Sequence, residues 1–317
     1  MSSKSNDQGR AYEYICLISL FESIKNIRKV KIVQNSSYEA ALRAWNTLDA
    51  YTQSLYTLSA KSTIDTIFAL EPNIIEIGDD SLCLYIQPDS HGEIADVRDI
   101  IIKRKGITWE IGLSIKHNHM AVKHSRIAKK LDFGEKWYGE KCSTSYWENV
   151  KPIFDFLEAE EKKGTLFRDL ENKEDQVYVP LLNAFKEEIS SRLNEDSTIA
   201  RKLVEYLLSK YDFYKIISVD EKRITIIQSF NMYGTLNLPS RSSKPSITIP
   251  IIKLPAKLIH IGFKPNSKTT ILMCFDNGWQ FSFRIHNAED YVKTSLKFDI
   301  QIVGMPAEIN IKFNCNW

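Results

Sequence analysis

The sequence predicts an α/β or α+β protein in which helices, a small mixed unit and further helices precede a β-rich final third. Three observations predict this class. Apolar residues recur at helical spacing near the N-terminus, short β-branched runs follow between turn residues, and alternating runs dominate after Tyr211. A length of 317 residues allows one large domain or two. We therefore expect a core in residues 1–212 and a β-rich region in residues 213–317.

The first half is expected to begin with a helix on which Glu13 shares a mostly apolar face with Cys16, Leu17 and Leu20. Turn residues Gly78-Asp79-Asp80 indicate a hairpin between two short strands. The expected elements are, in order, helices over 9–25 and 38–58, strands over 73–77, 81–87, 99–103 and 109–116, and a basic helix over 118–131.

The second half is expected to be helical over residues 147–208, with Pro152 and Pro180 near helix starts. Strands follow to the end of the chain, and Asp276-Asn277-Gly278 between two alternating runs is a strong hairpin signal. The expected strands are residues 214–219, 223–230, 257–263, 269–275, 279–285 and 296–303.

Composition excludes several classes of protein. The chain is 43% hydrophobic and 11% aromatic, which is unlike a disordered, collagen-like or low-complexity chain. Its five cysteines are scattered without a Cys-x-x-Cys pair, so we expect buried free thiols in a reducing compartment. We see no signal peptide and no apolar run of membrane-spanning length, so we expect a cytoplasmic protein with no membrane partner.

The net charge of +2 conceals opposing blocks. Residues 96–130 hold nine basic and three acidic residues, a net +6. Residues 155–196 hold six basic and twelve acidic residues, a net −6, and from residue 215 onward thirteen basic and seven acidic residues again give +6. Such an asymmetry favours a polyanion-binding face backed by an acidic helical layer.

The segment from Ala95 to Lys116 is the most informative for chemistry. Asp99 opens a β-branched strand, and a hairpin would bring it near the following strand. On that second strand the two-residue period places Glu110, Gly112, Ser114 and Lys116 on one face. Carboxylates that hold Mg²⁺ beside an ammonium that orients water are what metal-dependent phosphodiester hydrolysis needs. The segment therefore predicts a phosphodiesterase site.

The order Asp, strand, then acid-x-Lys on the next strand followed by a helix is the PD-(D/E)xK core of many type II restriction endonucleases, and this segment resembles it. The closer resemblance is to the HaeIII-type restriction endonucleases, which recognise GGCC, and it covers most of the chain. It is carried by four stretches, of which the third is the most specific: SNDQGRAYEY at 5–14, ADVRDIII at 95–102, IGLSIKHNHMAVKHSRIAKKLDFGEKW at 111–137 and WENVKPIF at 147–154.

The resemblance implies a Mg²⁺-dependent endonuclease that cuts double-stranded DNA within a short palindrome and leaves 5′-phosphate and 3′-hydroxyl ends. It implies a mixed sheet flanked by helices in residues 1–212, with a helical insertion, and DNA recognition by the β-rich residues 213–317. A homodimer is expected for a palindromic target, with a monomer that nicks each strand in turn as the alternative. A cognate DNA methyltransferase would protect the host site without being a bound partner.

Carried over to this chain, Asp99 matches the metal-binding Asp and Lys116 the catalytic lysine. Ser114 is a departure, because the family position holds Asp or Glu and a serine supplies no negative ligand. Glu13 is the first candidate for the second metal-binding carboxylate, and Glu110 and Asp96 are alternatives. A purely structural Glu13, paired with Arg10 one helical turn earlier, remains open.

Candidate DNA-binding residues fall in two places. The expected basic helix would align several cations along the DNA backbone, and these are His119, Lys123, His124, Arg126 and Lys130. The irregular segment 231–253 is a candidate base-reading loop through Arg241 and Lys244, and Gln228, Lys264 and Arg284 are weaker candidates. A zinc-dependent H-N-H nuclease is a competing interpretation of residues 117–119, but supporting metal ligands at suitable spacing are missing from the sequence.

Two other functions stay open at the level of sequence. A non-catalytic DNA-binding protein with a decayed nuclease core is favoured by Ser114 alone. An RNA- or nucleotide-processing hydrolase would treat duplex DNA as a poor substrate.

Overall fold

The structure is a computed structural model that describes residues 4–88, 96–118 and 123–317. It divides into two compact units, of which the first comprises residues 1–120, 209–252 and 307–317 and the second residues 121–208 and 253–306. The single boundary predicted after residue 212 does not separate these units. Strands late in the chain pair with early ones, so each unit is built from distant segments.

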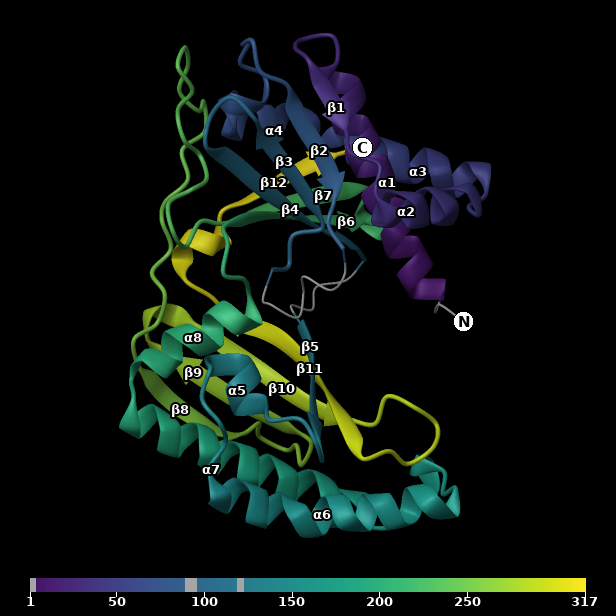
Figure 1. Cartoon of the computed structure of the whole chain (residues 1–317), viewed down its shortest axis with the longest axis vertical. Helices are drawn as coiled ribbons and strands as arrows, with labels where there is room; N and C mark the ends of the chain where they lie inside the picture. Colours follow the sequence, from purple (N-terminus) through teal and green to yellow (C-terminus); the bar gives the residue numbers. More distant parts are fainter. Residues whose placement is uncertain (1–3, 89–95, 119–122) are drawn as a thin grey trace. The chain divides into compact units, whose positions relative to one another are not determined.

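The first unit is built on a seven-stranded mixed sheet (Figure 1). The order across it is β1-β2-β3-β4-β6-β7-β12; β1 pairs with β2 and β4 with β6 in parallel, and the other neighbours are antiparallel. The bounds are β1 Val30–Ile32, β2 Leu82–Ile86, β3 Ile100–Arg104, β4 Trp109–His117, β6 Phe213–Val219, β7 Ile224–Phe230 and β12 Lys312–Asn316. An α/β fold with a mixed sheet is thus confirmed.

The described residues of this unit include four α-helices: α1 Lys4–Ile24, α2 Ser36–Asn46, α3 Ala50–Ser62 and α4 Ile64–Leu70. The single helix predicted over 38–58 is wrong, because Asp49 caps a new helix by accepting a hydrogen bond from the backbone N–H of Thr52. The strand predicted over 73–77 is also wrong, because a short 3₁₀ helix, Pro72–Ile74, occupies its start. The predicted hairpin before β2 therefore does not form.

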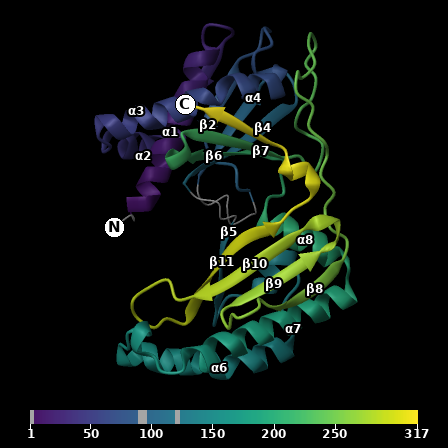
Figure 2. The ribbon, with the colours of Figure 1, turned by 180° about the vertical axis from the view of Figure 1, so that it is seen from behind.

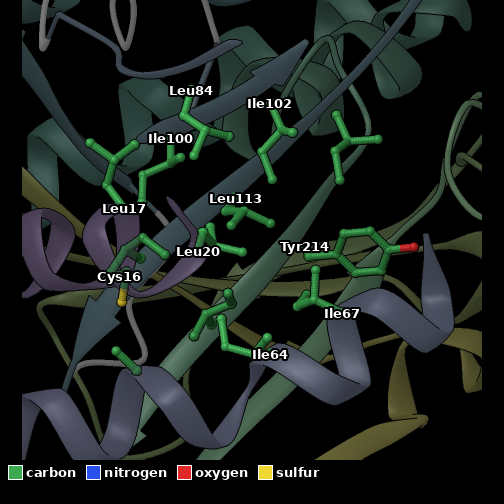
Figure 3. Packing of buried hydrophobic residues seen from close by; sticks show 14 of the residues in the cluster. Cys16, Leu17, Leu20, Ile64, Ile67, Leu84, Ile100, Ile102, Leu113 and Tyr214 are labelled. Carbon is green, nitrogen blue, oxygen red and sulfur yellow. The ribbon is translucent and has the colours of Figure 1, made fainter. Parts of the chain in front are cut away.

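The core of the first unit lies between the helices and one face of the sheet. Figure 3 shows Leu17 and Leu20 of α1 beside sheet residues such as Ile100 and Leu113. All four side chains are at most 3% exposed. Each buried apolar side chain of this size contributes roughly 1.5–3 kcal/mol. This packing fixes which face of the sheet turns away from the helices.

The second unit holds a five-stranded antiparallel sheet in the order β5-β11-β10-β9-β8 (Figure 2). Trp137 stacks on Tyr206, and Phe185 packs on Phe283 and Phe298, so aromatic rings join helices to the sheet. Its elements are β5 Lys123–Ala128, α5 Phe133–Tyr138, α6 Thr144–Lys163, α7 Val179–Glu195, α8 Thr198–Leu207, β8 Leu258–Phe263, β9 Thr270–Phe275, β10 Gln280–His286 and β11 Ser295–Gly304.

Two local predictions in this unit have different outcomes. The hairpin between β9 and β10 is confirmed, with Asn277 (φ 56°) and Gly278 (φ 85°) in the left-handed conformation of a tight turn. Pro180 lies at the start of α7 as predicted, whereas Pro152 lies inside α6.

The basic helix predicted over 118–131 is wrong, because residues 123–128 form β5. This strand pairs antiparallel with β11, and the pairing buries Ser125 and Ile127. The Ser125 hydroxyl lies 3.1 Å from that of Tyr206. Asn118, the first residue of the expected helix, instead follows β4 in the left-handed conformation (φ 52°). A partner strand more than 160 residues away therefore overrides the local charge pattern.

All five cysteines are free thiols, as the sequence predicts, and four of them are buried. Among the helices in the described part of the chain, none combines the length and apolar character needed to cross a bilayer.

Glu71, at the end of α4, is fully buried, and its Oε1 accepts 2.6 Å hydrogen bonds from the Tyr214 hydroxyl and the Asn237 N–H. Burial, the main cause, raises the pKa of Glu71 to about 7. Because the folded state holds this proton more tightly than the unfolded chain does, stability is lost as pH rises from about 4.5 to about 7 and then levels off.

A Glu71→Gln variant should therefore lose less stability than the wild type between pH 5 and pH 8, by about 3 kcal/mol at most. Urea unfolding at several pH values measures the difference in unfolding free energy. A constant offset between the two proteins across this range would contradict the prediction.

Candidate active site

Asp99 lies directly before β3 and is held against the end of β4. Its backbone N–H donates to Leu113 O at 2.8 Å, in the register of the sheet. Its Oδ2 accepts hydrogen bonds from the Ile115 N–H at 2.6 Å, from Lys116 Nζ at 3.1 Å and from Ser114 Oγ at 3.4 Å. The hairpin thus brings together Asp99, Ser114 and Lys116, three residues singled out in the sequence.

These groups combine fixed geometry with access to solvent. The Asp99 and Lys116 side chains keep 24% and 28% of their surface exposed, whereas Ser114 is 2% exposed. The core residues Leu113 and Ile115 alternate with Ser114 and Lys116 along β4, so the polar pair lies on the sheet face opposite the helices. Their exposed fractions leave the Asp99 carboxylate and the Lys116 ammonium accessible to a substrate.

Glu13 lies on α1 at the same end of the sheet. It lines a cavity of about 210 Å³ together with Arg10, Ser36, Ser37, Ala40 and Ile86. Ile86 pairs in register with Ile100, the residue after Asp99. Burial, the main cause, raises the pKa of Cys16 well above its ordinary value, and the negative charges of Glu13 and Asp99 add to that rise. Both carboxylates are therefore within electrostatic range of one thiol.

Asp96 and Glu110, the two other candidate metal ligands, are both paired with Arg98. The guanidinium binds Asp96 through two hydrogen bonds of 2.8 Å and Glu110 through one of 2.9 Å, and it lies 4.1 Å from the centre of the Tyr211 ring. Gly112 makes room for it, because a Cβ there would lie 2.0 Å from Arg98 Cδ. These two carboxylates thus neutralise the buried Arg98 guanidinium.

Lys215 is a residue of this region that the sequence analysis did not single out. It pairs in register with Ser114 on the neighbouring strand β6 and is 6% exposed. Burial, the main cause, lowers the pKa of Lys215 to about 8; the charge of Lys116 lowers it further and that of Asp99 opposes the change. A signal was present, because Lys215 is the only charged residue in an otherwise apolar and small-polar strand.

His117 and Asn118, the described part of the H-N-H stretch, make contacts within the protein. His117 Nε2 lies 2.8 Å from Asp220 Oδ2, and its Nδ1 lies 3.2 Å from the Tyr56 hydroxyl. Asn118 exchanges hydrogen bonds with Asp220 through Nδ2 and Oδ1. This arrangement supports a structural role for both residues.

The carboxylates of this region could supply only part of the coordination shell of a metal ion. Within residues 4–88, 96–118 and 123–317, no three or more His, Cys, Asp and Glu side chains are grouped so that they could hold a metal by themselves. Mg²⁺ usually takes only one or two protein carboxylates, with water and substrate phosphate as its other ligands. A metal ion at Asp99 would therefore need at most one further carboxylate from the protein.

The predicted DNA-binding residues of the basic segment lie in the second unit or outside the described residues. His119 lies outside them. Lys123 and His124 belong to β5. Arg126 is exposed on β5, where its Nη1 donates to Ser295 Oγ at 3.3 Å, and Lys130 is exposed after the strand.

The segment 231–252 is irregular, as predicted, and its base is anchored by buried side chains. Asp212 accepts hydrogen bonds from the N–H groups of Tyr233 and Thr235, and Asn73 donates to two carbonyl groups at residues 238 and 239. Glu76 accepts from the Ser242 N–H. Near that contact Arg241 and Lys244 are exposed. The segment therefore presents two cations to solvent while it is held by hydrogen bonds to the rest of the first unit.

Comparison with known proteins covers nearly the whole chain. The family model described as HaeIII restriction endonuclease matches residues 9–306. The chain is 50% identical over 310 residues to the Type II restriction enzyme HaeIII of Haemophilus aegyptius, which covers 98% of this chain and 97% of that protein. No solved structure matches it. With the Asp99, Ser114 and Lys116 cluster in place, these matches show that the chain belongs to the HaeIII restriction endonuclease family.

Proposed function

We propose that the protein is a type II restriction endonuclease that hydrolyses phosphodiester bonds in double-stranded DNA at GGCC and leaves 5′-phosphate and 3′-hydroxyl ends. Family membership over nearly the full chain supports this function. The observation that carries it is the contact between Asp99 Oδ2 and Lys116 Nζ, two side chains that are partly exposed near the end of β4. An acid and an ammonium at this spacing suit attack by water on a phosphate.

The PD-(D/E)xK core is part of this proposal. The mixed sheet flanked by helices is consistent with it, and the order Asp99, strand, Lys116 follows the motif. Ser114 remains a departure, and Glu13 replaces the missing carboxylate in this proposal. The β-rich residues 213–317 would contribute to DNA recognition, chiefly through the segment 231–252.

Type II restriction endonucleases generally use a divalent metal ion, and we infer Mg²⁺ held by Asp99 and Glu13. The ion would supply Lewis-acid stabilisation of charge on the phosphate. Lys116 orients the attacking water beside Asp99. The Ile115 N–H and the Ser114 hydroxyl fix the direction of the Asp99 carboxylate. The protein thus positions the reacting groups before DNA arrives.

The deciding experiment is a digest of a large DNA with Mg²⁺, followed by sequencing of the fragment ends. Fragments that end within GGCC, with 5′-phosphates, are expected. Binding to duplex DNA without any cutting would favour the decayed nuclease, for which Ser114 is the supporting observation. Cleavage of RNA in preference to duplex DNA would contradict the proposal.

A Glu13→Gln variant tests the second carboxylate. Loss of one negative ligand should raise the Mg²⁺ concentration needed for half-maximal cleavage about tenfold or more, while activity recovers in part at high Mg²⁺. The matched control is Glu39→Gln on α2, an exposed carboxylate of the same unit. An unchanged Mg²⁺ dependence would remove Glu13 from the site and direct attention to Glu110.

Arg241 and Lys244 are tested through salt dependence. Each phosphate contact contributes about 0.9 to the slope of log affinity against log salt concentration. An Arg241→Gln, Lys244→Gln double variant should reduce this slope by about 2 if both cations touch phosphates. If they read guanine instead, affinity for GGCC should fall while affinity for unrelated duplex stays constant. If the double variant had the salt slope and the GGCC affinity of the wild type, the segment would be excluded as a DNA contact.

The assembly and the cellular setting belong to the same proposal. A two-fold homodimer would read a palindrome most simply. Sedimentation of the protein bound to a GGCC duplex tests this, and a single complex with the mass of one protein chain plus one duplex would contradict it. A methyltransferase would protect the host GGCC sites without binding this protein. A cytoplasmic location agrees with five free cysteines, which a reducing compartment maintains.

A further inference from the structure

A line of polar residues crosses four adjacent strands of the seven-stranded sheet. Ser114 on β4 contacts Asp99 before β3 and pairs in register with Lys215 on β6. Lys215 in turn pairs with Gln228 on β7. Residues in register on neighbouring strands project from the same face, so these four residues share one side of the sheet.

That side is the one that faces away from the helical core. The residues that alternate with the line, including Leu113, Tyr214 and Ile227, belong to the apolar cluster under α1 and α4. Lys215 therefore points to the same side as Lys116, one strand further across the sheet from Asp99. The three groups interact electrostatically, since the charge of Lys116 lowers the pKa of Lys215 and the charge of Asp99 raises it.

Lys116 pairs with Asp99 at 3.1 Å, and Lys215 adds a second positive charge on the same side of the sheet. Lysine is among the residues least often buried, and Lys215 is 6% exposed in a strand whose other residues are uncharged. Hydrolysis of a phosphodiester increases the negative charge on the non-bridging oxygens in the transition state. A second ammonium one strand away from Asp99 and Lys116 would stabilise that charge.

We propose that Lys215 is a second active-site lysine, which binds a non-bridging oxygen of the scissile phosphate while Lys116 positions the water. The inference rests on the proposed function and extends it, because it assigns a substrate contact to a residue outside the hairpin that joins Asp99 and Lys116. It also accounts for a site in which Ser114 stands where a carboxylate is usual. With a serine in place of a carboxylate and a second lysine nearby, this face carries more positive charge, which favours binding of the anionic substrate.

The test compares Lys215→Gln with the wild type in single-turnover cleavage of a GGCC duplex at saturating enzyme. The variant should be slower by about 10²-fold. Its affinity for the duplex measured with Ca²⁺ and its thermal unfolding midpoint should stay close to the wild type. Lys215→Arg, which keeps the charge, should restore part of the rate. Lys61→Gln, an exposed lysine on α3, is the control for loss of one charge in the same unit.

A sulfur substitution separates a substrate contact from a structural role. An ammonium binds a non-bridging oxygen more strongly than a sulfur, so a phosphorothioate at the scissile position should slow the wild type and Lys61→Gln more than Lys215→Gln. Equal slowing in all three proteins would overturn the proposal, as would cleavage by Lys215→Gln at the wild-type rate. If Asp99→Asn and Lys116→Ala also cleaved at the wild-type rate, the proposed site itself would fail, and the inference with it.

Discussion

Asp99→Asn and Lys116→Ala variants are expected to cut GGCC duplex at least about 10³-fold more slowly than the wild type. The Asp99 carboxylate is the shared acceptor for the Ile115 N–H, the Ser114 hydroxyl and Lys116 Nζ. An amide in its place carries no charge for a metal ion. Removal of the lysine leaves the attacking water without its cation. Each change therefore disables the chemistry by itself.

Neither change should unfold the protein, because both side chains keep about a quarter of their surface exposed. Single-turnover rates and duplex affinity in Ca²⁺ measure the two effects separately. Effects of residues that act as a unit are not additive, so the double variant should be little slower than the slower single variant. Fully additive losses would indicate that Asp99 and Lys116 act in separate steps.

Arg98→Met is expected to destabilise the protein by about 3–5 kcal/mol. Asp96 is 4% exposed and Arg98 is 7% exposed, so removal of the guanidinium leaves a carboxylate buried without its cation. Glu110 and the Tyr211 ring lose the same partner. The empty space above Gly112 adds a cavity next to Ser114. A large loss of stability is the combined result.

Lys103→Met is the matched control, since this lysine also pairs with Glu110, at 3.5 Å, but is about half exposed. Its loss should change stability by less than about 1 kcal/mol. Urea unfolding of the three proteins gives the comparison. Equal and small effects of both substitutions would mean that the Arg98 cluster is dispensable for the fold.

The sequence predicts features that depend on neighbours in the chain. Asp99 and Lys116 meet because one hairpin joins their strands. The two-residue alternation of side chains along these strands can be recognised in the sequence. The turn at Asn277 is readable for the same reason. Lys215 was missed because its strand pairs with β4 only after a long intervening segment. No local pattern indicates which strand will become the neighbour of Ser114.

The basic segment 118–131 was predicted as a helix from its local pattern, whereas a distant partner makes part of it a strand. Lys, His and Arg at mixed spacing suit a helix face as well as a strand, so the choice depends on the partner. The partner is β11, whose pairing buries Ser125 and Ile127. The pairing of Asp96 and Glu110 with Arg98 was equally invisible, because it requires Gly112 as an opening for the arginine side chain.

The seven-stranded sheet is assembled from three separated stretches of chain, and its outer strand β12, Lys312–Asn316, pairs with β7. During synthesis β4 emerges with Asp99 and Lys116 long before β6, β7 and β12 exist to extend the sheet. Pairing between such distant segments is slow, because loop closure precedes any gain in contacts. Ser114 and Lys215, which lie in register on β4 and β6, can therefore meet only after the intervening residues 121–208 have been synthesised.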